Sequence, residues 1–280
     1  MKAPNNRLLA LAAAALASSA HGVLAGAADA MPPFRIEADA FQAGEADIRA
    51  VCSSAGAELW RYFPGYSVGA LVVVRRNGGP MVAFARNERG ETVIRLDTGG
   101  LYWCQYAYQF AHEFCHVLCG YDDDYRGNLW FEETLAETAS LFVLRAMARD
   151  WATAPPYPNW RDFRDALRRY VDDEMARFGA VQEIYKSGMQ EFYRRHRQEL
   201  EKEPCGRELN GAMAVVLLRY FEEQPERWEA VRWLNSAPSP QGETFEQYLR
   251  KWRAAVPERH REFVQSVAEL FGVTLDPAGR

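Results

Sequence analysis

The sequence predicts an α+β fold, in which a small antiparallel sheet packs with two long helices and is followed by an all-helical C-terminal part. Short apolar runs between turn residues occupy residues 68–96, and this pattern favours strands. From Trp103 onward apolar residues recur every three to four positions, which favours helices, and strand signals are absent after Pro158. We therefore expect an α+β unit over residues 31–152 and a helical unit over residues 153–280.

Composition and charge exclude two broad classes of protein. The 280 residues are 48% hydrophobic and 25% charged, which supports a sizeable core and argues against intrinsic disorder. The formal net charge of -5 gives no electrostatic basis for binding nucleic acid, so we expect no nucleic-acid partner.

The first thirty residues have the pattern of a secretory signal peptide. Lys2 and Arg7 form a positively charged start, and small residues follow the apolar run 8–17. That run is too short to span a bilayer comfortably, and no later stretch reaches spanning length. We therefore expect residues 1–30 to be removed on export, leaving a periplasmic or secreted protein without a membrane partner. An uncleaved anchor is the alternative.

The cysteines indicate neither a disulfide scaffold nor a structural cysteine–zinc site. There are five, so one must stay unpaired within the chain, and none belongs to a C-x-x-C pair. Cys115 and Cys119 lie one helical turn apart, and helix packing alone explains them as buried thiols.

The first elements are expected to be one helix and three strands. The helix covers residues 45–62, and its apolar residues share one face: Ile48, Val51, Ala55 and Leu59. The strands are expected at residues 68–74, 81–85 and 92–96, separated by turn signals at Asn77-Gly78 and at residues 87–90. The simplest assembly of these strands is an antiparallel meander.

The remaining elements are expected to be helices. The first runs from Trp103 to Cys119, where Gly120 ends it, and its apolar stripe is Tyr106, Phe110, Phe114 and Val117. The second runs from Leu129 to Ala148 with Asn128 as N-cap, and it should be buried because it is apolar around most of its surface. Further helices are expected at about residues 160–178, 182–202, 207–223, 243–254 and 258–271.

A motif with metal-ligand spacing lies on the helix that starts at Trp103. The segment His112-Glu113-Phe114-Cys115-His116 has the form H-E-x-x-H. Because a spacing of four returns to the same helix face, both imidazoles can reach one zinc ion, and Glu113 can accept a proton from a metal-activated water. The alternative is a pair of core histidines hydrogen-bonded near a carboxylate.

A catalytic zinc ion needs a third protein ligand, and the following helix supplies carboxylates. Glu133 and Glu137 share a stripe with Leu141 and Leu144, so both should face inward, where an unpaired carboxylate is costly. We assign Glu133 as the third ligand, with Glu132 as its main rival, and Glu137 as the acceptor that orients a ligand imidazole. Acidic residues also complement a helix dipole, which suffices to explain Glu132.

These segments resemble the gluzincin family of zinc metallopeptidases. After the H-E-x-x-H motif comes Trp130-Phe131-Glu132-Glu133-Thr134-Leu135-Ala136-Glu137, which looks like the Trp-x-x-Glu-Gly-x-Ala segment that gives the ligand glutamate in that family. The order of helix, three strands, motif helix and glutamate helix is similar to the compact gluzincin core with its active-site helices. The resemblance covers residues 45–150 and implies a Zn²⁺ cofactor.

Two positions depart from the family pattern. Thr134 stands where aminopeptidase-like members have Gly, and Glu208 stands where a Tyr-x-Lys-Gly stretch gives the tyrosine that steadies the oxyanion. Other candidates for that helper are Tyr185, Tyr193, His196 and His260. A metzincin arrangement with Asp122 as third ligand is an alternative. That pattern requires a glycine at position 119, but Cys119 stands there and the glycine follows at Gly120.

The expected function is zinc-dependent hydrolysis of a peptide or protein substrate, with Glu113 as general base. The strand at residues 92–96 shortly precedes the motif helix and is expected to offer its edge to an extended peptide. The missing tyrosine motivates an alternative, a non-catalytic zinc-binding or degenerate peptidase that acts as a partner-binding scaffold. A third alternative is an inert helical secreted protein, which predicts no stoichiometric metal.

Overall fold

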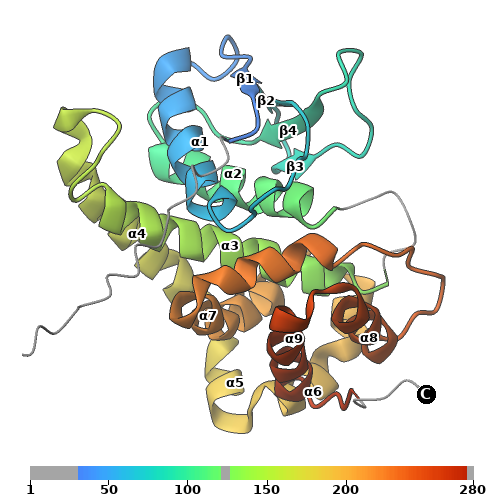
Figure 1. Cartoon of the computed structure of the whole chain (residues 1–280). Coiled ribbons are helices and arrows are strands. Elements are labelled where there is room, and N and C mark those ends of the chain that lie inside the picture. The colour runs from blue at the N-terminus through green and yellow to red at the C-terminus, as the bar shows by residue number, and fades with distance from the viewer. Residues whose placement is uncertain (1–30, 121–126, 276–280) are drawn as a thin grey trace, which may run out of the picture.

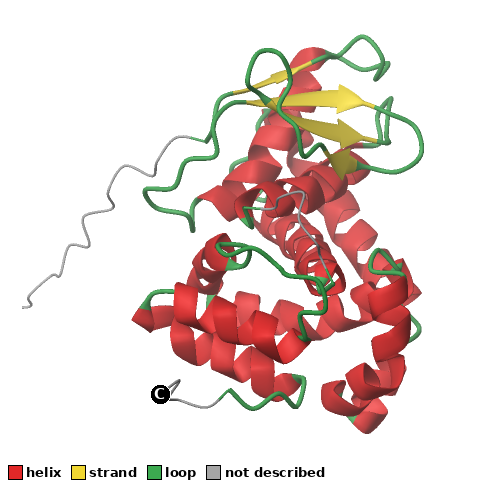
Figure 2. Cartoon of the chain, turned by 90° about the vertical axis from the view of Figure 1, so that its right-hand side faces the viewer, coloured by secondary structure: helices red, strands yellow, loops and turns green. Residues whose placement is uncertain are grey.

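Strands lie at one end of the fold, and helices make up the rest (Figure 2). The computed structural model describes residues 31–120 and 127–275, and over these residues the chain is α+β with a helical C-terminal part, as predicted. The expected signal peptide, residues 1–30, lies outside the described residues. None of the helices described is both long and apolar enough to cross a membrane.

The sheet is mixed, so the prediction of an antiparallel meander is wrong. Its strands are β1 (Phe34–Ile36), β2 (Leu71–Arg75), β3 (Met81–Val82) and β4 (Thr92–Leu96), in the order β1-β2-β4-β3. β2 is parallel to β1 and β4, and β3 runs antiparallel to β4. Asp97 explains the change, because its carboxylate accepts the backbone N–H groups of Gly78 and Gly79 at 3.1 and 2.8 Å. This contact holds the turn between β2 and β3 next to the end of β4. β3 then pairs with the edge of β4 that faces away from β2.

The strand order decides which edge faces outward. β4 lies between β2 and β3, so the prediction that residues 92–96 offer an edge to a peptide is wrong. β3 is the outer strand on that side of the sheet.

Helices α1 (Glu45–Trp60) and α2 (Trp103–Leu118) pack against the sheet and each other. The apolar stripe predicted for α2 is buried. The rings of Phe110 and Phe114 stack with centroids 5.6 Å apart, and Phe114 also contacts Trp60 of α1. Gly120 follows the helix with a φ of 64°, a conformation that glycine adopts readily and that ends a helix.

Helix α3 (Leu129–Asp150) runs through the middle of the molecule, between α2 and the C-terminal helices (Figure 1). It is buried over most of its length, as predicted. Its polar residues Thr134, Thr138 and Ser140 donate to backbone carbonyls one turn earlier, which satisfies their hydroxyls inside the core. The side chain of Asn128 does not cap the helix and instead donates to the carbonyl of Glu243 at 3.3 Å.

Helices follow to the end of the described chain. They are η1 (Pro158–Phe163), α4 (Arg164–Arg177), α5 (Val181–Ser187), α6 (Met189–Lys202), α7 (Arg207–Glu223), η2 (Pro225–Trp233), α8 (Phe245–Ala255) and α9 (Glu258–Leu270). The helix predicted at 182–202 is two helices, because Gly188 interrupts it with φ 85° and ψ 158°. Helix α7 packs against α3, and one continuous cluster of buried apolar side chains includes residues from the sheet and from these helices.

Candidate metal centre

Helices α2 and α3 pack so that two histidines and a glutamate face one another. The Glu133 carboxylate lies 3.2 Å from His112 Nε2 and 3.6 Å from His116 Nε2. Each of these side chains offers one ligand atom, and the three atoms lie within 4.8 Å of one another. The structure therefore brings together the three residues that the sequence assigned as zinc ligands.

Carboxylates also face the other nitrogen of each imidazole. His116 Nδ1 lies 2.5 Å from Glu132 Oε1, and His112 Nδ1 lies 3.7 Å from Glu137 Oε2. Glu137 thus lies where an acceptor for a ligand imidazole was predicted. Glu132, expected to be a rival ligand or a helix-dipole residue, instead contacts His116 on the side away from Glu133. Carboxylates at both Nδ1 atoms direct both Nε2 atoms toward the shared position.

Further polar contacts hold these carboxylates in place. Asn235 Nδ2 donates to Glu132 Oε2 at 2.6 Å, and the Tyr248 hydroxyl donates to Asn235 Oδ1 at 3.0 Å. On the other side, the Tyr108 hydroxyl donates to Glu137. Sequence reasoning missed these residues because Asn235 lies 103 positions from Glu132, so no local spacing connects them.

Glu113 lies beside the cluster and is 3% exposed. A backbone hydrogen bond from Val82 of β3 reaches its carboxyl group. Burial raises the pKa of Glu113, and the neighbouring histidines and Val82 oppose this shift only in part. A carboxylate of raised basicity is suited to accept a proton near neutral pH.

The electrostatics of the cluster fit a divalent cation. Burial opposes charge on His116 and Glu133, yet the contacts between imidazoles and carboxylates raise the pKa of His116 to about 10 and lower that of Glu133 to about 2. Glu132 and Glu133 lie against the two imidazoles, and burial raises the pKa of both Glu113 and Glu137, that of Glu137 to about 7. A divalent cation would stabilise the charged form of these carboxylates. Two imidazole nitrogens and one carboxylate oxygen form a donor set that suits zinc.

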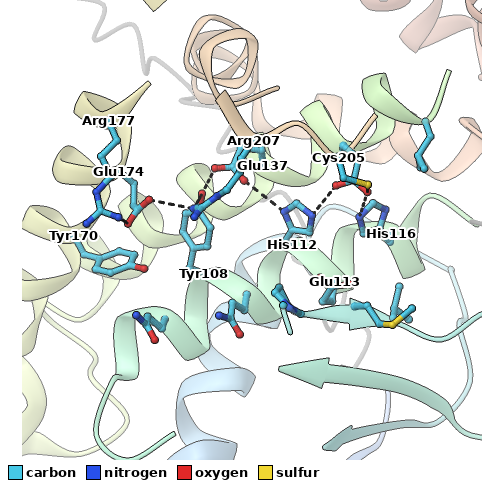
Figure 3. A pocket seen from close by; sticks show the side chains of 18 of the residues that line it. Tyr108, His112, Glu113, His116, Glu137, Tyr170, Glu174, Arg177, Cys205 and Arg207 are labelled. Atoms are coloured by element: carbon cyan, nitrogen blue, oxygen red, sulfur yellow. Dashed lines mark hydrogen bonds and ion pairs between the residues drawn. The ribbon is translucent and has the colours of Figure 1, made fainter. Parts of the chain in front are cut away.

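A pocket of about 670 Å³ opens over the cluster (Figure 3). The predicted ligands and Glu113 line it together with Met81 and Val82 of β3. Cys205, which the sequence did not single out, also lines the pocket, and its Sγ lies 3.6 Å from Glu133 Oε1. All five cysteines are free thiols, and Cys115 and Cys119 are buried, as predicted.

The candidates for an oxyanion helper lie elsewhere in the structure. Tyr185 is 64% exposed, Tyr193 stacks on Trp130, and His196 and His260 pair with glutamates of the helical part. None of these four side chains lines the pocket. Glu208 accepts the backbone N–H of Ala180 and does not line the pocket. Asp122, the metzincin alternative, lies outside the described residues.

Comparison with protein-family models, with curated proteins and with solved structures found no match for this chain. The functional argument therefore depends on the geometry and chemistry of the site itself.

Proposed function

We propose that this chain is a zinc-dependent metallopeptidase of the gluzincin type, which hydrolyses peptide bonds. One observation carries the proposal: His112, His116 and Glu133 each offer one ligand atom within 4.8 Å of the other two, and all three residues line one pocket. A pair of structural histidines has no need of four carboxylates around it, and burial of a charged carboxylate costs free energy. A bound cation would stabilise the charged form of each carboxylate.

The neighbouring side chains have roles that fit this chemistry. A zinc ion held by the three ligands would supply Lewis acidity, lowering the pKa of a water molecule and polarising a substrate carbonyl. Glu113 takes a proton at its carboxylate and returns it to the leaving amine, a role that its raised pKa favours. Glu132 and Glu137 keep the two imidazoles oriented.

The outer strand β3 favours an extended peptide as substrate. Met81 and Val82 line the pocket, and among the described strands β3 pairs only with β4. A peptide can lie along such an edge next to the proposed metal ligands, where the backbone donor of Val82 already serves Glu113. The pocket volume of about 670 Å³ is within the range of ligand-binding clefts.

Metal analysis and a peptide-library assay on the purified protein test the proposal. Wild type and Glu113→Gln should each contain about one zinc ion per chain, whereas His112→Ala and Glu133→Ala should contain far less. His196→Ala is the matched control, since His196 lies outside the pocket, and it should keep its zinc. Hydrolysis should be lost in Glu113→Gln and in both ligand variants.

Two results would contradict the proposal. Equal zinc content in wild type, His112→Ala and Glu133→Ala would show that these residues do not bind zinc. Full hydrolysis by Glu113→Gln would show that Glu113 is not the general base. Zinc binding without hydrolysis of any peptide would instead support the partner-binding scaffold.

A further inference from the structure

The pocket extends beyond the metal ligands to a pair of arginines. Arg177 ends α4 and Arg207 begins α7, and both line the same pocket as His112. Figure 3 shows them on the side of His112 away from His116. Their side chains are 67% and 59% exposed, so both are accessible from solvent.

One buried glutamate holds both guanidinium groups. Glu174 is 2% exposed, and it accepts from Arg177 Nη1 at 2.8 Å and from Arg207 Nη2 at 3.1 Å. Glu174 offsets one of the two positive charges, and Glu137, which accepts from Tyr108, is the other acidic side chain of the pocket that acts on Arg207. Among the described residues, these contacts use a single nitrogen of each guanidinium group, and the remaining N–H groups are available for an anion.

Contacts with Tyr108 place Arg207 beside α2, one turn before the proposed metal ligand His112. Arg207 lies over the Tyr108 ring at 5.4 Å and donates to its hydroxyl at 3.1 Å. Tyr108 precedes His112 by one turn of α2, which is about 6 Å along the helix axis. An extended peptide rises about 3.3 Å per residue, so one helical turn corresponds to roughly two residues of a bound peptide.

We propose that Arg177 and Arg207 form a subsite for a carboxylate of the substrate. The inference rests on the proposed peptidase function and gives it a specificity: cleavage roughly two residues from a carboxylate. That carboxylate comes from the C-terminus of a short peptide or from an acidic side chain. Guanidinium groups suit either source, because their N–H groups match the geometry of a carboxylate and form strong charge-assisted hydrogen bonds.

Binding measurements on the full-length, zinc-loaded Glu113→Gln variant test the subsite without turnover. Isothermal titration compares two pairs of peptides: one pair differs only in a free or amidated C-terminus, and the other only in Glu or Gln at an internal position. The carboxylate member of one pair should bind about tenfold more tightly. The pair that shows the preference identifies the source of the carboxylate.

Arginine variants connect that preference to the subsite. Arg177→Gln leaves Glu174 paired with Arg207 and should reduce the preference to less than about threefold, whereas Arg177→Lys, which keeps the charge, should retain most of it. Arg197→Gln is the matched control, because Arg197 is exposed on α6 and pairs with Glu201, and its preference should equal that of the parent. Zinc content and unfolding temperature show that each variant is folded.

Three outcomes would overturn the subsite: equal affinity for both members of both pairs, an unchanged preference in Arg177→Gln, or no binding of any peptide. Different results would contradict the peptidase proposal. A preference that depends on Arg177 would keep the subsite even if the wild-type protein hydrolysed no peptide, and hydrolysis without a preference would leave the peptidase and remove the subsite.

Discussion

A single buried glutamate outside the proposed ligand set controls the orientation of His116. Glu132 is 1% exposed and lies between His116 Nδ1, at 2.5 Å, and Asn235 Nδ2, at 2.6 Å. Because the carboxylate accepts from both neighbours, Nδ1 carries a proton, and Nε2 faces Glu133 and the proposed metal position.

Replacing Glu132 by Gln should weaken zinc binding by about 10- to 100-fold. The amide group has nearly the same shape, but it cannot accept hydrogen bonds on both sides, so the imidazole loses its fixed tautomer. Competition with a chromophoric chelator measures the affinity. Glu246→Gln, at an exposed glutamate that pairs with Arg250, should bind zinc as wild type does. Unchanged affinity in Glu132→Gln would contradict this role.

Glu58 should make the stability of the protein depend on pH. It lies on α1, is 5% exposed and pairs with Arg61 at 3.0 Å. Burial raises its pKa from 4.5 to about 8, although Arg61 opposes the shift. The folded state therefore holds the proton more tightly than the unfolded state. The free energy of unfolding should fall as the pH rises from 4.5 to about 8 and should not fall further above that range.

A Glu58→Gln variant should lose this part of the pH dependence. Urea unfolding of wild type and variant at pH 5, 7 and 9 measures the difference, which should grow with pH by up to about 1.4 kcal/mol per unit in favour of the variant. Other titrating groups cancel in the comparison. A constant difference at all three values would show that Glu58 titrates normally.

At the scale of elements, Gly188 separates α5 from α6. Its φ of 85° and ψ of 158° lie in a region that is essentially restricted to glycine. Gly188→Ala should therefore lower the free energy of unfolding by about 1–3 kcal/mol, measured by urea denaturation. Gly179→Ala is a close control, because Gly179 has no positive φ and its added Cβ would meet only Glu208 at an ordinary 3.7 Å. Equal losses in both variants would contradict the conformational argument.

Helices were predictable from the sequence, whereas the pairing of strands was not. Apolar spacing located α1, α2 and α3 to within a few residues, because each helix buries a stripe that local sequence specifies. The strand order depends instead on contacts between distant residues, such as Gly79 with Asp97. β1 has three residues, too few for a periodic signal.

Local sequence likewise predicted some residues of the candidate site and could not predict others. Four-residue spacing predicted that His112 and His116 share a face, and the inward stripe of α3 predicted the position of Glu133. The partners that surround them come from far along the chain: Arg207 reaches Tyr108 across 99 positions. The contact between Glu132 and His116 was not predicted, because a carboxylate in a first helical turn is already explained by the helix dipole.

At the scale of the whole molecule, polar contacts connect the proposed metal centre to both ends of the helical part. One route passes from His116 through Glu132 and Asn235 to Tyr248 on α8. A second passes from Glu137 through Tyr108 and Arg207 to Glu174 on α4. Ordering the two imidazoles around an ion therefore favours the packed arrangement of α2, α3, α4 and α8 together.

Zinc should consequently stabilise the whole chain in one transition rather than α2 and α3 alone. A ligand that binds only the folded state at 100 times its Kd adds about 2.7 kcal/mol to the free energy of unfolding. Differential scanning calorimetry with zinc and with a chelator should show a single peak that moves to higher temperature with the metal. His116→Ala, which removes one ligand and the start of the route through Glu132, should show no such shift. An equal shift in that variant would place zinc elsewhere, and a split peak would show that the helical part unfolds independently of the metal centre.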